Sequence, residues 1–140
     1  MSSFNYTIAI DAMGGENSPD KVIEGLSLFL KEDKEIFFNI FGKETSIVEE
    51  ISKYKNILPQ NYKIINCENQ IEDKNSVRDA IKVGKDTSMW KAIESVKNKE
   101  SHLIISSGNT GALLVISKLL IKMMDGIDKP AIAGLGPIFK

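Results

Sequence analysis

Short apolar runs alternate along the chain with longer segments in which apolar residues recur at helical spacing. Runs rich in β-branched and aromatic residues are typical of buried strands, and they span residues 6–10, 35–42, 62–67 and 102–106. Segments with apolar residues three and four positions apart are typical of amphipathic helices, and they span residues 19–30, 47–54, 90–96 and 112–124. The pattern therefore predicts a regular alternation of strands and helices.

Three weaker signals complete the predicted order of elements. Ser18 is placed to cap a helix that begins at Pro19, where the missing N–H costs nothing. Residues 68–89 are polar and mixed, so we expect the longest irregular connection there. Residues 130–137 read as the start of a fifth strand. Since there is no repeat and no linker, residues 1–140 are expected to form a single α/β domain.

Strands that alternate with helices indicate a parallel sheet, because parallel strands need long crossovers and helices supply them on both faces. In such a sheet every loop from a strand to a helix lies at the carboxyl edge, where ligands bind. We therefore expect residues 11–19, the segment after Cys67 and residues 106–111 to share one edge.

Composition narrows the class of protein. Hydrophobic residues make up 42% and charged residues 26% of the chain, as in an ordinary globular protein. The net charge is −1 and Arg78 is the only arginine among 18 basic residues, which disfavours a general nucleic-acid binder. Any anion would be held by lysines and backbone amides.

A single cysteine and a single histidine limit the available chemistry further. Cys67 permits no internal disulfide, and His102 alone excludes the usual zinc patterns, so we expect a reducing cytoplasm, no metal and no cofactor. The first residues show no signal peptide, and no apolar stretch reaches the length of a membrane span. His102, Trp90 and the pair Met123 and Met124 are interpreted as structural residues.

The first candidate motif is "DAMGGENSP". Gly14 and Gly15 allow close approach of a ligand to the backbone, and the helix that follows offers unpaired N–H groups to an anion. An ordinary tight turn explains the glycines equally simply and is the favoured interpretation of this motif alone. Asp11 could position a ligand hydroxyl or a cation, or could only cap the turn.

Two further segments offer anion-binding chemistry. In "SSGNTG", Ser106, Ser107, Asn109 and Thr110 surround two glycines before a helix, which suits phosphate but also suits a serine-capped helix start. The segment is neither a Walker loop nor G-x-G-x-x-G. In "KVGKDTSMW", Lys82 and Lys85 could clamp an anion, although a basic pair is commonly only a solvated surface.

Taken together, the three segments resemble one family. The strings "IAIDAMGGENSP", "KDTSMWKAIESVK" and "SGNTGALL" stand in the order and approximate spacing of the PlsX family, the acyl-acyl carrier protein:phosphate acyltransferases of bacterial phospholipid synthesis. The resemblance covers residues 8–130, which is less than half of a usual family member. The chain is thus similar to the N-terminal portion of such an enzyme.

The resemblance implies a fold, a reaction and a set of site residues. The fold would be like that of isocitrate and isopropylmalate dehydrogenases, and the reaction would move a fatty acyl group from acyl carrier protein to inorganic phosphate. A cytoplasmic homodimer with peripheral membrane contact is implied as well. Asn109 and Lys85 would be catalytic. The residues expected to bind substrate or phosphate are Asp11, Gly14, Gly15, Glu16, Ser88, Ser107, Gly108, Thr110 and Gly111.

The chain also departs from the family's pattern. Glu16, Asn75 and Lys82 stand where aspartate, proline and arginine are usual, and the leucine-proline-threonine turn after "KPAIAGLGP" is not recognisable. Two alternatives stay open at this point: an enzyme like phosphate acetyltransferase that uses acetyl-coenzyme A, and a folded fragment without catalytic activity.

Overall fold

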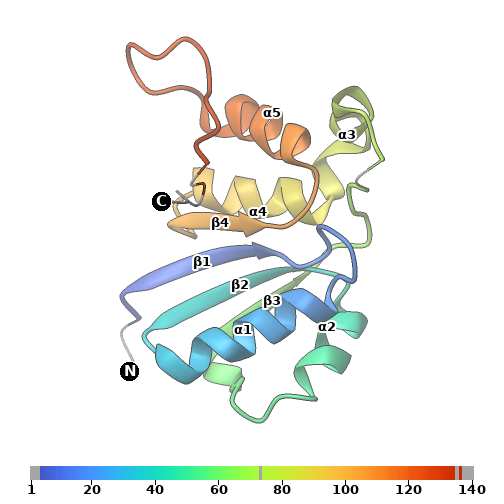
Figure 1. Ribbon diagram of the computed structural model, residues 1–140, viewed down its shortest axis with the longest axis vertical. Helices are drawn as coiled ribbons and strands as arrows, with labels where there is room; N and C mark the ends of the chain where they lie inside the picture. The colour runs from blue at the N-terminus through green and yellow to red at the C-terminus, as the bar shows by residue number, and fades with distance from the viewer. Residues whose placement is uncertain (1–3, 73, 135, 137–140) are drawn as a thin grey trace.

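The computed structural model describes residues 4–72, 74–134 and 136, and its centre is a sheet of four parallel strands (Figure 1). The strands are β1 (Tyr6–Asp11), β2 (Ile36–Gly42), β3 (Tyr62–Asn66) and β4 (Leu103–Ser106). Their order across the sheet is β3-β2-β1-β4, and all three pairings are parallel. The predicted α/β class with a parallel sheet is confirmed.

Helices cover the two faces of the sheet unequally. Helices α1 (Asp20–Glu32) and α2 (Glu44–Ile51) lie on one face (Figure 1). Helix α4 (Ser88–Lys97) lies on the other, with α3 (Val77–Val83) and α5 (Thr110–Ile121) packed outside it. The chain runs from β1 to β3 in one direction and then returns past β1 to β4. Because crossovers are right-handed, that reversal moves the later helices to the opposite face.

The strands alternate between two apolar layers. Ile8 and Ile10 of β1 pack with α1, whereas Ala9 between them packs toward α4. The layer beneath α1 and α2 is the larger, and its buried members include Ile23, Leu26, Leu30, Phe38, Ile40, Ile47 and Ile51. The core is therefore continuous through β1 and β2, the two central strands.

The segment predicted to be irregular contains a helix, so that prediction was wrong. Helix α3 begins after Ser76, whose side chain accepts a hydrogen bond from the Asp79 N–H at 3.2 Å. A 3-10 turn at Gly84–Asp86 then leads to Thr87, which caps α4. Only Ala80 of α3 is buried, so the helix has almost no apolar stripe by which a sequence pattern could reveal it.

The expected cap of the first helix was also wrong. Helix α1 begins at Asp20, and Pro19 occupies the cap position without a side-chain hydrogen bond. The Ser18 hydroxyl instead donates to the Gly14 carbonyl oxygen at 2.5 Å. Ser18 therefore stabilises the glycine loop and not the helix.

The C-terminal elements differ from the prediction as well. Helix α5 starts two residues earlier and ends three residues earlier than residues 112–124, and Met124 is 80% exposed instead of lying in the core. Of the expected fifth strand, residues 130–134 and 136 form no strand, while residues 135 and 137 lie outside the described residues. Strand β4 begins after His102, which is exposed and accepts a hydrogen bond from the Thr7 N–H at its Nδ1 atom.

Candidate functional site

The three motif segments meet at the carboxyl edge of the sheet, as the sequence predicted, and Asp11 joins them. Asp11 is the last residue of β1, and its two carboxylate oxygens accept different hydroxyls. Oδ1 accepts from Ser88 at 2.6 Å, and Oδ2 accepts from Ser106 at 2.7 Å. Ser88 begins α4 and Ser106 ends β4. The Asp11 side chain thus connects the carboxyl ends of the neighbouring strands β1 and β4 with the start of helix α4.

Burial determines what Asp11 can do. The residue is 2% exposed, and burial raises the pKa of its carboxyl while hydrogen bonds from Ser88 and Ser106 partly offset the rise. A carboxylate whose oxygens are already engaged in this way is suited to holding loops in register. We therefore interpret Asp11 as a positioning residue for the edge, and the ligand-binding role that the sequence suggested stays a prediction.

The glycines bring the loops after β1 and β4 into direct backbone contact. A Cβ atom on Gly14 would lie 2.8 Å from the Gly108 nitrogen and 2.7 Å from Asp11 Oδ2. Gly15 has φ +87°, and a Cβ there would lie 2.6 Å from the Ser107 carbonyl oxygen. Packing between the two loops therefore requires glycine at positions 14 and 15, whether or not a ligand binds. We call this contact between the loops after β1 and β4 the joint.

Asn109 shapes the start of α5. Its Oδ1 accepts the Ala112 N–H at 2.9 Å as the helix cap, and its Nδ2 donates to the Asn75 carbonyl at 2.9 Å. The cap is therefore asparagine and not serine. The first-turn amides of Thr110 and Gly111 have no carbonyl four residues earlier within the helix, so they remain suited to an anion.

Other predicted site residues lie around this joint with fewer contacts. Ser107 is exposed and lines the adjoining groove, and Glu16 is exposed in the loop after β1. Lys85 is exposed in the 3-10 turn before α4. Among the described residues, no ion pair or hydrogen bond joins Lys85 or Glu16 to Asp11. The structure thus assembles the serines, glycines and Asp11, and leaves these two charges on the surface.

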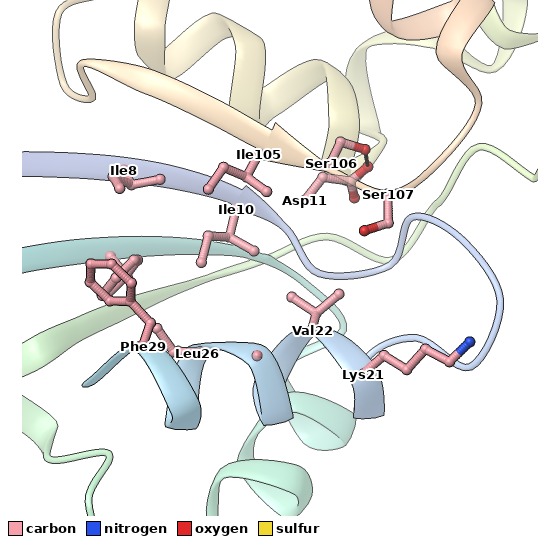
Figure 2. A pocket seen from close by; sticks show the side chains of 12 residues that line it. Ile8, Ile10, Asp11, Lys21, Val22, Leu26, Phe29, Ile105, Ser106 and Ser107 are labelled. Atoms are coloured by element: carbon pink, nitrogen blue, oxygen red, sulfur yellow. Dashed lines mark hydrogen bonds between the residues drawn. The ribbon is translucent and has the colours of Figure 1, made fainter. Parts of the chain in front are cut away.

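An apolar groove of about 340 Å³ adjoins the joint, between α1 and the face of β4 that α4 does not cover (Figure 2). We call it the α1–β4 groove. Side chains of Ile10 and Ile105 point into it from the sheet, and Val22 points into it from α1 (Figure 2). Its remaining lining residues are Ile8, Asp11, Lys21, Gly25, Leu26, Phe29, Phe38, Ser106 and Ser107.

Ser106 and Lys21 take positions at the site that the sequence did not predict. Ser106 was considered only as a phosphate donor, whereas its hydroxyl bonds to Asp11 and its Oγ accepts the Gly108 N–H at 3.2 Å. Lys21 lines the polar end of the groove. A cation in the first turn of a helix is opposed by the helix dipole, and this unfavourable placement was the signal available in the sequence.

Fold and site together define the class of protein: a parallel α/β protein whose carboxyl edge carries a helix start and glycine loops suited to an anion. The family model described as fatty acid synthesis protein matches residues 6–140. The chain therefore belongs to the fatty acid synthesis protein family, which is the PlsX family that its three motifs resemble.

Several curated relatives are phosphate acyltransferases. The one from Pelagibacter ubique is 49% identical over 131 residues, which cover 93% of this chain and 38% of that protein. The one from Paramagnetospirillum magneticum is 36% identical over 96% of the chain and 38% of its own length. The one from Ehrlichia ruminantium is 39% identical over 90% of the chain and 38% of its own length. The chain thus spans well under half of these relatives.

The described part of the chain contains no helix that is both long and apolar enough to cross a membrane. Within the same residues, no three His, Cys, Asp or Glu side chains gather as they would around a metal ion.

Proposed function

We propose that the chain carries the phosphate-holding part of an acyltransferase that moves a fatty acyl group from acyl carrier protein to inorganic phosphate. The observation that supports this most directly is the joint at the carboxyl edge, where Asp11 of the first family motif accepts hydrogen bonds from Ser88 of the second and from Ser106, the residue directly before the third. Family membership and the names of the relatives agree with this chemistry.

In the proposed reaction, an oxygen of hydrogen phosphate attacks the thioester carbonyl carbon. A C–O bond forms, the C–S bond breaks, and the carrier thiolate leaves with the proton that phosphate gives up. Phosphate is already a nucleophile at neutral pH, so the protein mainly has to position it and stabilise the developing oxyanion. No histidine base is needed for this chemistry.

The proposed roles follow the geometry of the edge. The amides of Thr110 and Gly111 at the start of α5 hold phosphate, with the Ser107 hydroxyl and Gly108 beside them. Lys85 supplies a positive charge once the exposed side chain turns toward the edge. Asn109 fixes the direction of the helix start through its cap, and it orients substrate through that position.

The remaining expectations are proposals about the longer family protein. We propose that it has the dehydrogenase-like arrangement of the family, that it is a cytoplasmic homodimer, and that it contacts the membrane peripherally. The uncovered face of β4, where Leu103 is 44% and Ile105 is 51% exposed, supports the alternative that residues 1–140 form an incomplete domain without turnover of their own.

A phosphate titration followed by amide NMR tests the proposed site. We expect shift changes at residues 106–111 and 13–17 that saturate with phosphate, with little change on adding the same ionic strength of chloride. Shifts confined to exposed lysines elsewhere, such as Lys34 at the opposite end of the sheet, would contradict the placement. Acyl-chain competition then separates an acyl carrier enzyme from one that prefers acetyl-coenzyme A.

Assays of acyl phosphate formation test the question of completeness. We expect little or no turnover by the chain alone, because near-attack geometry needs phosphate and thioester held about 3–3.5 Å apart by two walls of a cleft. Activity that appears only after mixing with the remaining part of a relative would support a shared site. Efficient turnover by the chain alone would contradict the fragment alternative.

A further inference from the structure

Helix α3 carries exposed side chains that are basic and apolar on the same face. Arg78, Ile81 and Lys82 are exposed, and they lie three and four residues apart, which places them side by side on a helix. Lys85 follows in the 3-10 turn after the helix. Residues 74–85 contain four basic side chains and one acidic one, although the whole chain has a net charge of −1. We call Arg78, Ile81 and Lys82 the α3 patch.

The positive charge of the α3 patch is not used within the described part of the chain. No ion pair among the described residues includes Arg78 or Lys82. The neighbouring carboxylates have other partners, since Asp79 accepts the Ser76 hydroxyl at 2.6 Å and Asp86 lies 3.9 Å from a lysine ammonium of α4. The planar guanidinium of the only arginine also suits carboxylates better than an ammonium does. The patch is therefore suited to carboxylates of another molecule.

Both ends of α3 adjoin the edge at which we place phosphate. In the loop before the helix, the Asn75 carbonyl accepts a hydrogen bond from the Asn109 side chain at 2.9 Å. After the helix, the 3-10 turn leads to Ser88, whose hydroxyl donates to Asp11 at 2.6 Å. Helix α3 itself packs against α5 and lies beside its start (Figure 1). A partner bound to the α3 patch is thus held next to the loops of the proposed site.

We propose that the α3 patch docks the acyl carrier protein, through a carrier helix that presents carboxylates around an apolar side chain. The inference rests on the proposed function, because that reaction takes its acyl group from a protein that the enzyme must recognise. Carboxylates of the carrier pair with Arg78 and Lys82, and the apolar centre of its helix covers Ile81. The prosthetic arm of the docked carrier then passes α3 to reach the start of α5.

The amount and arrangement of exposed surface favour a protein partner over a membrane. Binding to a bilayer interface grows with the apolar area that is buried, and α3 has seven residues with two large apolar side chains exposed, Ile81 and Val83. One apolar side chain with charges around it instead matches the apolar centre and polar rim of a small protein interface. Interfaces of transient partners are the smallest of the specific ones, as a carrier that must leave after each turnover requires.

Fluorescence anisotropy of a labelled, acylated carrier protein tests the docking with two charge reversals. One variant of the chain combines Arg78→Glu with Lys82→Glu, and the control combines Lys31→Glu with Lys34→Glu at the other end of the sheet. Both change the net charge equally. We expect the patch variant to weaken carrier binding roughly tenfold or more, because like charges then face each other, and the control to leave it unchanged.

Folding of the variants is controlled in two ways. Glutamate at position 78 stands in the first turn of α3, where the helix dipole favours an acidic side chain, and circular dichroism checks each variant. A neutral pair, Arg78→Gln with Lys82→Gln, should weaken binding less than the reversal does. No binding by the natural chain, or equal affinities for the patch variant and the control, would overturn the proposal.

The apolar centre of the patch has its own matched pair. Ile81→Ser should weaken carrier binding several-fold, whereas Leu28→Ser, at another exposed apolar position on α1, should not. If binding is sensitive to salt but unaffected by Ile81→Ser, the carrier is only attracted at long range, and the patch is not a docking surface.

Kinetics of a complete family enzyme that carries this chain separate docking from chemistry. The charge reversal of the α3 patch should raise the Michaelis constant for the acyl carrier roughly tenfold or more, while the Michaelis constant for phosphate stays the same. A rise in the constant for phosphate would assign Arg78 and Lys82 to the phosphate site and overturn the proposal. An enzyme that forms no acyl phosphate would contradict the proposed function, and carrier binding by the chain would still decide the role of the patch.

Sedimentation with vesicles of phosphatidylglycerol tests the membrane as the other occupant. We expect the natural chain to stay in the supernatant at the concentrations at which it binds the carrier. If it sediments with the vesicles, and the charge reversal of the α3 patch prevents this, the patch binds anionic lipid and the proposal is wrong.

Discussion

Two glycine-to-alanine substitutions should change stability in opposite directions, because the glycines have opposite surroundings. At Gly14 the new methyl group would lie 2.7 Å from Asp11 Oδ2, 2.8 Å from the Gly108 nitrogen and 2.9 Å from Ser106 Oγ. One of these neighbours is backbone and the others are held in hydrogen bonds. At Gly25 the methyl group would meet nothing within 4 Å.

The magnitudes follow from these distances. Overpacking at Gly14 should cost about 1–3 kcal/mol, and the lower entropy of the unfolded alanine chain returns about 0.4–1 kcal/mol of that. We therefore expect a net loss of roughly 1–2 kcal/mol in the free energy of unfolding for Gly14→Ala. Gly25 lies inside α1, so Gly25→Ala should gain about 0.5–1 kcal/mol.

Urea unfolding followed by circular dichroism at pH 7 measures both changes on one scale. The slope of free energy against urea should stay the same for the two variants, so that a shift in midpoint reports stability. If Gly14→Ala is as stable as the natural chain, the loops after β1 and β4 can separate at no cost, and the joint described above does not hold the edge together. Gly134→Ala, in open space outside the helices, serves as the neutral control.

Three further predictions concern the residues of the edge. Because the pKa of Asp11 is raised by burial, the folded state binds its proton more tightly than the unfolded state. The contribution of the Asp11 carboxyl to the free energy of unfolding is thus present below the unfolded pKa of about 3.9 and is lost as the pH rises through the pKa of the folded state. In urea unfolding, Asp11→Asn should therefore lose less stability at pH 7 than near pH 4. In a complete family enzyme that carries this part, Lys85→Ala should raise the Michaelis constant for phosphate by roughly tenfold or more, because it removes a charge-assisted contact of about 1.5–3 kcal/mol. Lys34→Ala, the control, should leave the Michaelis constant unchanged. An unaltered constant in a folded Lys85→Ala enzyme would make Lys85 a surface residue. Asn109→Ala should cost about 1 kcal/mol in unfolding through loss of the α5 cap, and Asn109→Ser should restore most of it. If Asn109→Ser also restores full acyl phosphate formation in the complete enzyme, Asn109 acts only as a cap.

The sequence by itself determined the class of fold and the edge on which the site lies. Short apolar runs rich in β-branched residues, such as residues 6–10, are typical of buried strands when turn residues end them, and their alternation with helices indicates a parallel sheet. Parallel strands then place the segments after Asp11 and after Ser106 at one edge without further information. Local chemistry therefore located the candidate site.

Tertiary structure decided what the individual residues do there. The sequence could not show that Ser106 bonds to Asp11, that Ser18 serves the glycine loop, or that Gly14 and Gly108 touch, because each contact joins atoms brought together only by the folded loops. Helix α3 could not be predicted for the same reason, because only Ala80 of this helix is buried and its sequence has no apolar stripe that would indicate a helix. The uncovered face of β4 is likewise a property of the arrangement: residues 102–106 read as a fully buried strand, and only the handedness of the crossovers leaves one side of it without a helix.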